Sequence, residues 1–190
     1  AEGYATVASS PYAHAEGFQS SATNHHAHAE GRQTLASGLG AHTEGYFTTA
    51  SGNYSHADGY GTLADGQYSR AGGGSTRASG QYAYALGQQA LASGNGSFAQ
   101  GFQPTGSGEY SHALGYKNKA SGDYSFAHGY ESNAQGTYSF TQGYQTNAVS
   151  FYSHASGYRS TGSAAYAHAQ GRETVASALH AHSEGYTTLA

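Results

Sequence analysis

Histidines recur along this sequence at every fourteenth position in two runs, and most are followed two positions later by a carboxylate. The histidines are His14, His28, His42 and His56, then His154, His168 and His182. The carboxylates are Glu16, Glu30, Glu44, Asp58 and Glu184. Imidazole and carboxylate groups bind divalent metals, but a regular ladder does not converge four ligands on one point. We therefore expect no metal site here, and predict instead a stacked ladder whose contacts respond to pH.

Aromatic side chains follow the same spacing as the histidines. One set comprises Tyr54, Tyr68 and Tyr82, followed by Tyr110, Tyr124, Tyr138, Tyr152 and Tyr166. A second set comprises Tyr116, Tyr130, Tyr144 and Tyr158. Tyrosine stripes of this kind can bind glycans or another protein, because the ring offers a large area at low entropic cost. Aromatic pairs on neighbouring strands also stabilise ordinary sheets, and we favour this second role for any single stripe.

Other kinds of chemistry have little support. Ser, His and Asp are abundant, but they occur in periodic series, so their proximity carries no information about catalysis. No phosphate-binding loop is present, and Gly72–Gly74 interrupts the repeat as a low-profile coil. We therefore expect neither an enzyme nor a cofactor site, since catalysis needs a concave, non-repeating pocket.

The charge of the chain argues against a nucleic-acid partner, and its hydropathy argues against a membrane span. Charged residues make up 9% of the 190 residues, the formal net charge is −4, and five Arg and two Lys are scattered. A nucleic-acid surface needs clustered cations. A membrane span needs a run of about 18 apolar residues, which is absent.

The elements that must carry these side chains are set by one strict repeat. Glycine falls at every fourteenth position from Gly3 to Gly185 without an insertion. The series includes Gly17, Gly31, Gly45, Gly59, Gly87, Gly101, Gly115, Gly129, Gly143, Gly157 and Gly171. Five positions after each glycine stands a small residue, such as Ala36, Ala50 or Ala120. Residues 1–190 therefore read as one continuous repeat domain.

Residues 110–123 show how one repeat is built. Small Ser111, Ala113 and Gly115 alternate with larger side chains, as on the two faces of a strand. A second alternation follows at residues 118–122, and most repeats then turn at a glycine that we expect to have a positive φ. The pattern predicts an all-β fold, a single-stacked parallel β-solenoid with 14-residue coils and two short strands per coil. Its core would be narrow, filled by Ala, Ser, Thr and Gly.

A longer period overlies the coils. Unusual residues such as Arg32 and Arg172, or Leu39 and Leu179, stand ten coils apart. We infer a duplicated block of ten coils, and expect the chain to be a fragment of a longer fibre protein.

The coil pattern resembles the head repeats of YadA-like trimeric autotransporter adhesins. The matching stretches are Ser111-His-Ala-Leu-Gly115, Ser125-Phe-Ala-His-Gly129 and Ser139-Phe-Thr-Gln-Gly143. Residues 12–17 and 54–59 resemble the SHAEG variant of the repeat, found in phage fibres and bacterial surface proteins. The resemblance covers the whole chain, and implies a left-handed β-roll, trimerisation and an adhesive role. The adhesin heads carry Val and Ile at their two outward positions, where this chain carries His or Phe and then Glu, Gln or Leu.

If the chain assembles, we expect the face with the large side chains to form the contact, because large exposed apolar patches usually mark interfaces. The candidate interface residues are Tyr54, His56, Phe98, Tyr110, His112, Leu114, Tyr124, Phe126, Tyr138, Phe140, Tyr152 and His154.

These patterns favour a structural or adhesive segment of an extracellular fibre, the head or stalk of a trimeric surface adhesin or a phage fibre. The alternative is a self-assembling structural filament subunit with no ligand of its own. The expected partners are further copies of the chain, in a trimer or a filament, and a host surface protein or glycan. The expected location is a cell surface, a filament or a virion fibre.

Overall fold

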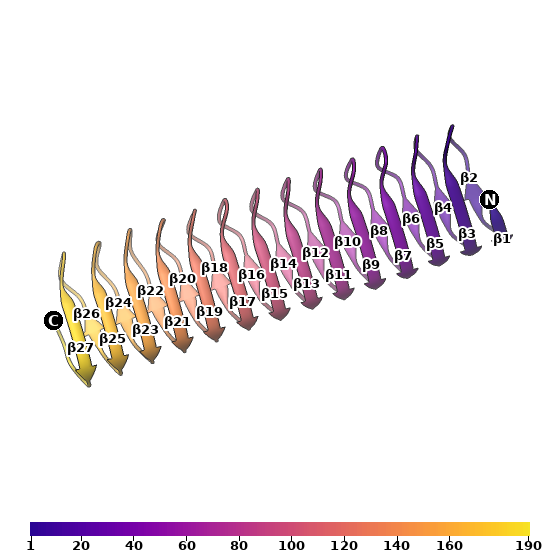
Figure 1. The fold of residues 1–190 in the computed structure, drawn as a ribbon. Coiled ribbons are helices and arrows are strands. Elements are labelled where there is room, and N and C mark those ends of the chain that lie inside the picture. Colours follow the sequence, from indigo (N-terminus) through magenta and orange to yellow (C-terminus); the bar gives the residue numbers. More distant parts are fainter. The chain divides into compact units, whose positions relative to one another are not determined.

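The computed structural model describes residues 1–190, and every regular element in it is a β-strand. The chain divides into two compact units, Ala1–Gly96 and Ser97–Ala190. In each unit a coil contributes one long and one short strand, drawn as the paired arrows of Figure 1, except that the last coil has only the long strand. No helix is present that is long and apolar enough to cross a membrane.

The long strands of the first unit are β1 (Glu2–Tyr4), β3 (His14–Phe18), β5 (His28–Arg32), β7 (His42–Tyr46), β9 (His56–Tyr60), β11 (Arg70–Gly74) and β13 (Tyr84–Gln88). Its short strands are β2 (Val7–Ala8), β4 (Ser21–Ala22), β6 (Leu35–Ala36), β8 (Thr49–Ala50), β10 (Leu63–Ala64), β12 (Arg77–Ala78) and β14 (Leu91–Ala92).

The long strands of the second unit are β15 (Phe98–Phe102), β17 (His112–Tyr116), β19 (Phe126–Tyr130), β21 (Phe140–Tyr144), β23 (His154–Tyr158), β25 (His168–Arg172) and β27 (His182–Tyr186). Its short strands are β16 (Thr105–Gly106), β18 (Lys119–Ala120), β20 (Asn133–Ala134), β22 (Asn147–Ala148), β24 (Thr161–Gly162) and β26 (Val175–Ala176).

The strands pair in parallel, in a register of one coil. Ala57 pairs with Ala71 on the next long strand, and Ala64 pairs with Ala78 on the next short strand. In each unit the long strands form one sheet and the short strands form another. The predicted parallel β-solenoid with 14-residue coils and two strands per coil is thus confirmed. Its left-handed sense stays a prediction from the resemblance.

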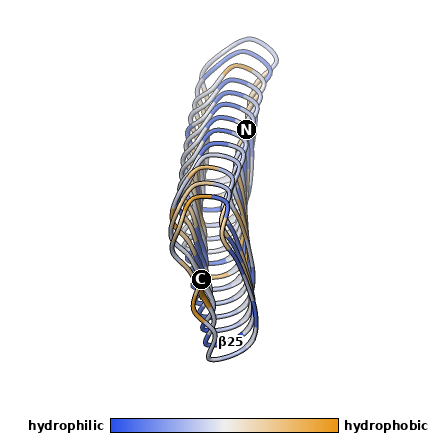
Figure 2. Cartoon of the chain, turned by 90° about the vertical axis from the view of Figure 1, so that its left-hand side faces the viewer, coloured by the Kyte–Doolittle hydropathy of each residue, from blue (hydrophilic) through white to orange (hydrophobic).

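The core between the two sheets is made of small side chains. Ala113, Ala120, Ala127 and Ala134 form one fully buried cluster. The largest fully buried side chain of the whole chain is Asn118, followed by threonines. Figure 2 shows accordingly that most of the chain is hydrophilic or neutral in hydropathy. The sheets therefore approach closely, and the core has no space for a larger side chain.

The buried side chain of Asn118 is hydrogen-bonded to the backbone of the next coil. Its amide nitrogen donates to the carbonyl of Gly129 at 2.7 Å, and its Oδ1 accepts from the backbone N–H of Ser132 at 2.8 Å. Both partners lie one coil further along the chain. A buried amide is tolerated here because the next coil supplies its donor and its acceptor.

The turn glycines do not have the backbone conformation that the sequence predicted. Turn glycines such as Gly52 and Gly66 do not have the positive φ that we expected. They are required instead by close approach, since a Cβ on Gly66 would lie 2.0 Å from the carbonyl oxygen of Gly80. Gly115, expected on the inward face, is exposed and has a φ of +114°. The alternation of faces ends there because the left-handed conformation turns the chain out of the pleat.

Most left-handed corners of the coils are supplied by residues other than glycine. Tyr54 has a φ of 57° and Lys117 has a φ of 52°. Each such residue costs about 1–2 kcal/mol relative to the right-handed conformation. The backbone N–H of Tyr54 donates to Leu39 at 2.7 Å, and that of Lys117 donates to Phe102 at 2.8 Å. These bonds to the preceding coil help to hold the corners in place.

Enlarging a core side chain should destabilise the second unit. Ala120→Leu places further carbon atoms where Ala120 is fully buried, and overpacking of this kind costs about 1–3 kcal/mol. Lys119→Leu adds a leucine at the exposed neighbouring position and is the control. Thermal and urea unfolding followed by circular dichroism would measure both. Equal midpoints for the two variants would show that the inward and outward faces are assigned the wrong way round.

Adding a side chain at two glycines of the first unit should change the stability by different amounts. Gly66→Ala forces a Cβ against the backbone of Gly80, so we expect a loss of stability of at least about 1–3 kcal/mol. Gly61→Gln should be tolerated, since only Ser75 Oγ at 3.7 Å faces its Cβ and Gln89 occupies the matching corner with a φ of 53°. Urea midpoints would report the difference, and a stable Gly66→Ala variant would contradict the close-approach explanation.

Candidate functional site

The outward face of the long strands carries the predicted site residues. His56, Phe98, His112, Phe126, Phe140 and His154 each begin a long strand, and Leu114 is the third residue of β17. We call the series at the first strand position the histidine rank, and the series two positions later the carboxylate rank. Both ranks point away from the core because the residues between them are buried alanines, threonines or, in β27, Ser183.

The tyrosines expected on this strand face lie instead at its edge. Tyr54, Tyr110, Tyr124, Tyr138 and Tyr152 all precede the long strands and occupy left-handed corners. We call this series the corner rank. The correction follows from the backbone, because a left-handed residue interrupts the alternation that would have placed the tyrosine beside the histidine.

The histidine rank of the first unit is closely stacked. The ring centroids of successive histidines from His14 to His56 lie 4.9, 4.8 and 4.7 Å apart. The ring orientations differ, since His14 is perpendicular to His28, whereas His28 and His42 are parallel to within 10°. His14 Nε2 lies 3.3 Å from Glu16, and His56 Nε2 lies 3.7 Å from Asp58.

The histidine rank of the second unit is more apolar. Phe126 and Phe140 stack at 5.2 Å, and Phe140 lies 4.8 Å from His154. His154 in turn lies 4.4 Å from His168. Burial and then the charge of His168 lower the pKa of His154 from its ordinary value. Its neighbour in the carboxylate rank is Ser156, which offers no compensating charge.

The corner rank forms stacked aromatic ladders. The centroids of the five tyrosines from Tyr110 to Tyr166 are 5.4, 5.0, 4.8 and 5.4 Å apart, and all the pairs are stacked. Tyr110 is 51% exposed and Tyr152 is 46% exposed, so about half of each of these rings faces solvent. Exposed tyrosines in such a row offer a large contact area at low entropic cost.

A second aromatic ladder lies where the long strands of the second unit end. Phe102, Tyr116, Tyr130, Tyr144 and Tyr158 stack at 5.1, 4.7, 4.8 and 5.0 Å. Lys117 lies over the ring of Tyr116, and Arg159 lies over that of Tyr158. The tyrosine series predicted from the sequence are therefore brought together as ladders.

A polar pocket beside the short strands of the second unit was not predicted. It is lined by Lys117, Lys119, Glu131, Asn133, Gln145, Asn147 and Arg159. Asn133 Nδ2 donates to Asn147 Oδ1 at 3.0 Å, and Gln145 Nε2 donates to Glu131 at 2.8 Å. The same 14-residue spacing relates these partners, so the spacing of polar residues on the short strands is the signal in the sequence for this pocket.

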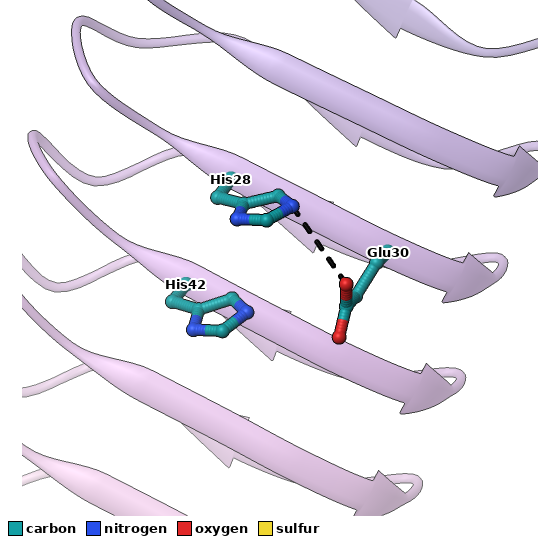
Figure 3. Close-up of side chains that lie close together, drawn as sticks. All are labelled: His28, Glu30 and His42. Carbon is teal, nitrogen blue, oxygen red and sulfur yellow. Dashed lines mark ion pairs between the residues drawn. The ribbon is translucent and has the colours of Figure 1, made fainter. Parts of the chain in front are cut away.

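One part of the histidine rank converges more than we expected of a regular ladder. His28, Glu30 and His42 bring one ligand atom each to within 4.8 Å of one another, as Figure 3 shows. His28 and Glu30 lie on β5, and His42 begins β7. The parallel rings and the carboxylate between the two strands make this the most compact group of metal-ligand types in the ladder.

The repeated coils and periodic outward ranks define a structural repeat protein. A family model described as YadA head domain repeat matches residues 29–55, 78–102 and 107–132. These three stretches therefore match YadA-like head repeats, as the motifs indicated, and they lie on a parallel β-solenoid. The comparison with curated proteins gave no match.

The stability of the second unit should fall below neutral pH because of His154. Its pKa is lowered in the folded chain, so the unfolded chain binds the proton more readily. The contribution to stability is present above the unfolded value of 6.5 and is lost as pH falls through the lower folded value. Urea midpoints between pH 8 and pH 5 would measure this loss.

His154→Phe should flatten that pH dependence, because it removes the titrating group, and the ring of Phe140 already lies 4.8 Å from the ring at this position. The control is His128→Gln, which removes an exposed imidazole of the same unit and should keep the native slope. If the urea midpoint of the His154→Phe variant fell with pH as steeply as that of the native chain, another group would be responsible for the loss of stability.

Proposed function

We propose that the chain is an adhesive head or stalk segment of an extracellular trimeric fibre, as in bacterial surface adhesins or phage fibres. The observation that carries the proposal is the pair of partly exposed aromatic ladders at the two ends of the long strands, on a scaffold that matches YadA-like head repeats. Large exposed apolar patches usually mark interfaces.

The contact between copies is formed by the outward face of the long strands, with Phe126 and Phe140 in its apolar part. These rings stack with each other, and each is only partly buried by its own chain. Their neighbours in the carboxylate rank are His128 and Gln142, so no acidic side chain is brought into the contact by these two strands. The corner rank then borders the contact, and its outer edge is available to a host surface protein or glycan.

The oligomeric state tests this assignment. Light scattering after size-exclusion chromatography should give a mass near three times 19.5 kDa for the native chain. The double variant Phe126→Glu with Phe140→Glu should lower that mass, because two carboxylates would be buried without partners.

The matched control is Asn133→Glu with Asn147→Glu, which places the same two charges on neighbouring short strands of the same unit. It should remain trimeric. A monomeric native chain would reject the proposal, and a native chain that grows into assemblies of indefinite mass would favour the filament subunit instead. Dissociation of the control alone would move the interface to the short strands.

A further inference from the structure

The pairing of β5 with β7 places His28 directly opposite His42. The two ring centroids are 4.8 Å apart and the ring planes differ by 10°. Figure 3 shows a nitrogen-bearing edge of each ring turned toward Glu30, whose carboxylate lies to the side of the two rings. The three side chains therefore direct their polar atoms toward one place on the surface.

The two imidazoles have nitrogen atoms without partners at this place. Nε2 of His28 and Nε2 of His42 are both shielded from solvent and make no hydrogen bond. The carboxylate of Glu30 lies 3.8 Å from His28 Nε2, which is beyond hydrogen-bonding distance. Leaving buried polar atoms unpaired is unfavourable, so the arrangement gains from a group that all three side chains can bind.

We propose that His28, Glu30 and His42 form a binding site for a divalent transition-metal ion of the zinc type. Two imidazole nitrogens and one carboxylate oxygen are a ligand set that suits Zn²⁺ and Cu²⁺. The three side chains are partly exposed, so water can complete the coordination sphere. The proposal does not depend on the oligomeric state or on the adhesive role.

The geometry requires only small side-chain movements. Tetrahedral zinc with bonds of about 2.0–2.1 Å brings its ligand atoms to about 3.4 Å from one another. The three ligand atoms already lie within 4.8 Å. Rotation of the two rings about the Cβ–Cγ bond and adjustment of the longer Glu30 side chain close this gap, while the strand pairing stays as it is.

The neighbouring positions of the ladder lack one feature or another of this site. The ring of His14 is perpendicular to that of His28, and His14 is hydrogen-bonded to Glu16. Asp58, beside His56, forms an ion pair with the guanidinium of Arg70 at 3.5 Å.

The second unit provides a natural comparison. His154 and His168 are paired in the same register and stack at 4.4 Å, and Nε2 of His168 is also without a partner. Ser156 occupies the position that corresponds to Glu30, so the third ligand is missing there.

Calorimetric titration of the metal-free full chain with ZnCl₂ at pH 7.5 tests the site, with the stoichiometry counted per chain. We expect one equivalent to bind. Glu30→Gln and His42→Phe should each raise the Kd at least about tenfold, since changes even in groups that only support a ligand cost about 10–100-fold. His168→Phe removes an imidazole that is stacked in the same way but has Gln170 beside it, and this variant should bind zinc as the native chain does.

A gain of binding provides the complementary test. Ser156→Glu completes the corresponding group with His154 and His168, and should raise the stoichiometry from one equivalent to two. The imidazole ¹⁵N resonances of His28 and His42 should shift on the first equivalent, and those of His154 and His168 only in the variant. Circular dichroism would verify that every variant keeps the native fold.

Three results would overturn the proposal. They are the absence of zinc binding by the native chain up to millimolar concentration, native affinity in both Glu30→Gln and His42→Phe, and an equal loss of affinity in His168→Phe. The last result would mean that any stacked pair of histidines in the ladder binds metal weakly, whatever carboxylate lies beside it.

Discussion

The close stacking of coils in a constant 14-residue register is the constraint on which the rest of the structure depends. Within a unit, main-chain hydrogen bonds join each coil to the next, as between Leu63 and Thr76 or between Arg77 and Ala90, each at 2.9 Å. Glycines permit this approach, since a side chain at Gly66 or Gly115 would strike the carbonyl of the next coil. A shift of one position in a strand would move its side chains to the opposite face.

The same constraint explains why the surface consists of ladders. A residue pointing outward lies directly beside its counterparts on the preceding and following coils, so side-chain chemistry is presented in rows. Tyr116 stacks on Tyr130 at 4.7 Å, and Asn133 is hydrogen-bonded to Asn147 at 3.0 Å. Recognition by such a surface depends on extended rows, which suits a contact with another elongated molecule better than the capture of a small substrate in a pocket.

Much of the fold follows from the sequence because it depends on period and alternation alone. The small residues at Ala113 and Ala120 are buried as expected, and the strands overlap the stretches in which small and large residues alternate. The corners were less predictable. Tyr54 adopts a left-handed conformation that glycine normally favours, because its backbone is hydrogen-bonded to the previous coil and its ring stacks on Tyr68 at 5.3 Å. Local propensity cannot show an arrangement that the neighbouring coil supports.

The ladders themselves were predictable for the same reason, whereas the orientation of their rings was not. His14, His28 and His42 are chemically identical and equally spaced, yet one pair is perpendicular and the next is parallel. A ring can turn about its own bonds without disturbing the strand, so a contact such as that of His14 with Glu16 is enough to change its orientation locally. The convergence of ligands at one pair of coils is a property of these side-chain contacts, which the period does not encode.

The thin core also explains how one scaffold carries different surfaces. Stability in a solenoid is largely a sum of contacts between neighbouring coils, and here those contacts are made by the main chain and by buried Ala, Ser and Thr. The identity of an outward residue does not change the register of the coils, so the histidine rank holds His56, Arg70 and Tyr84 on successive long strands without altering the fold. Substitution at these positions changes charge and shape along the row while the spacing stays constant. The outward ranks are therefore the part of the molecule in which binding specificity can be altered at the lowest cost in stability.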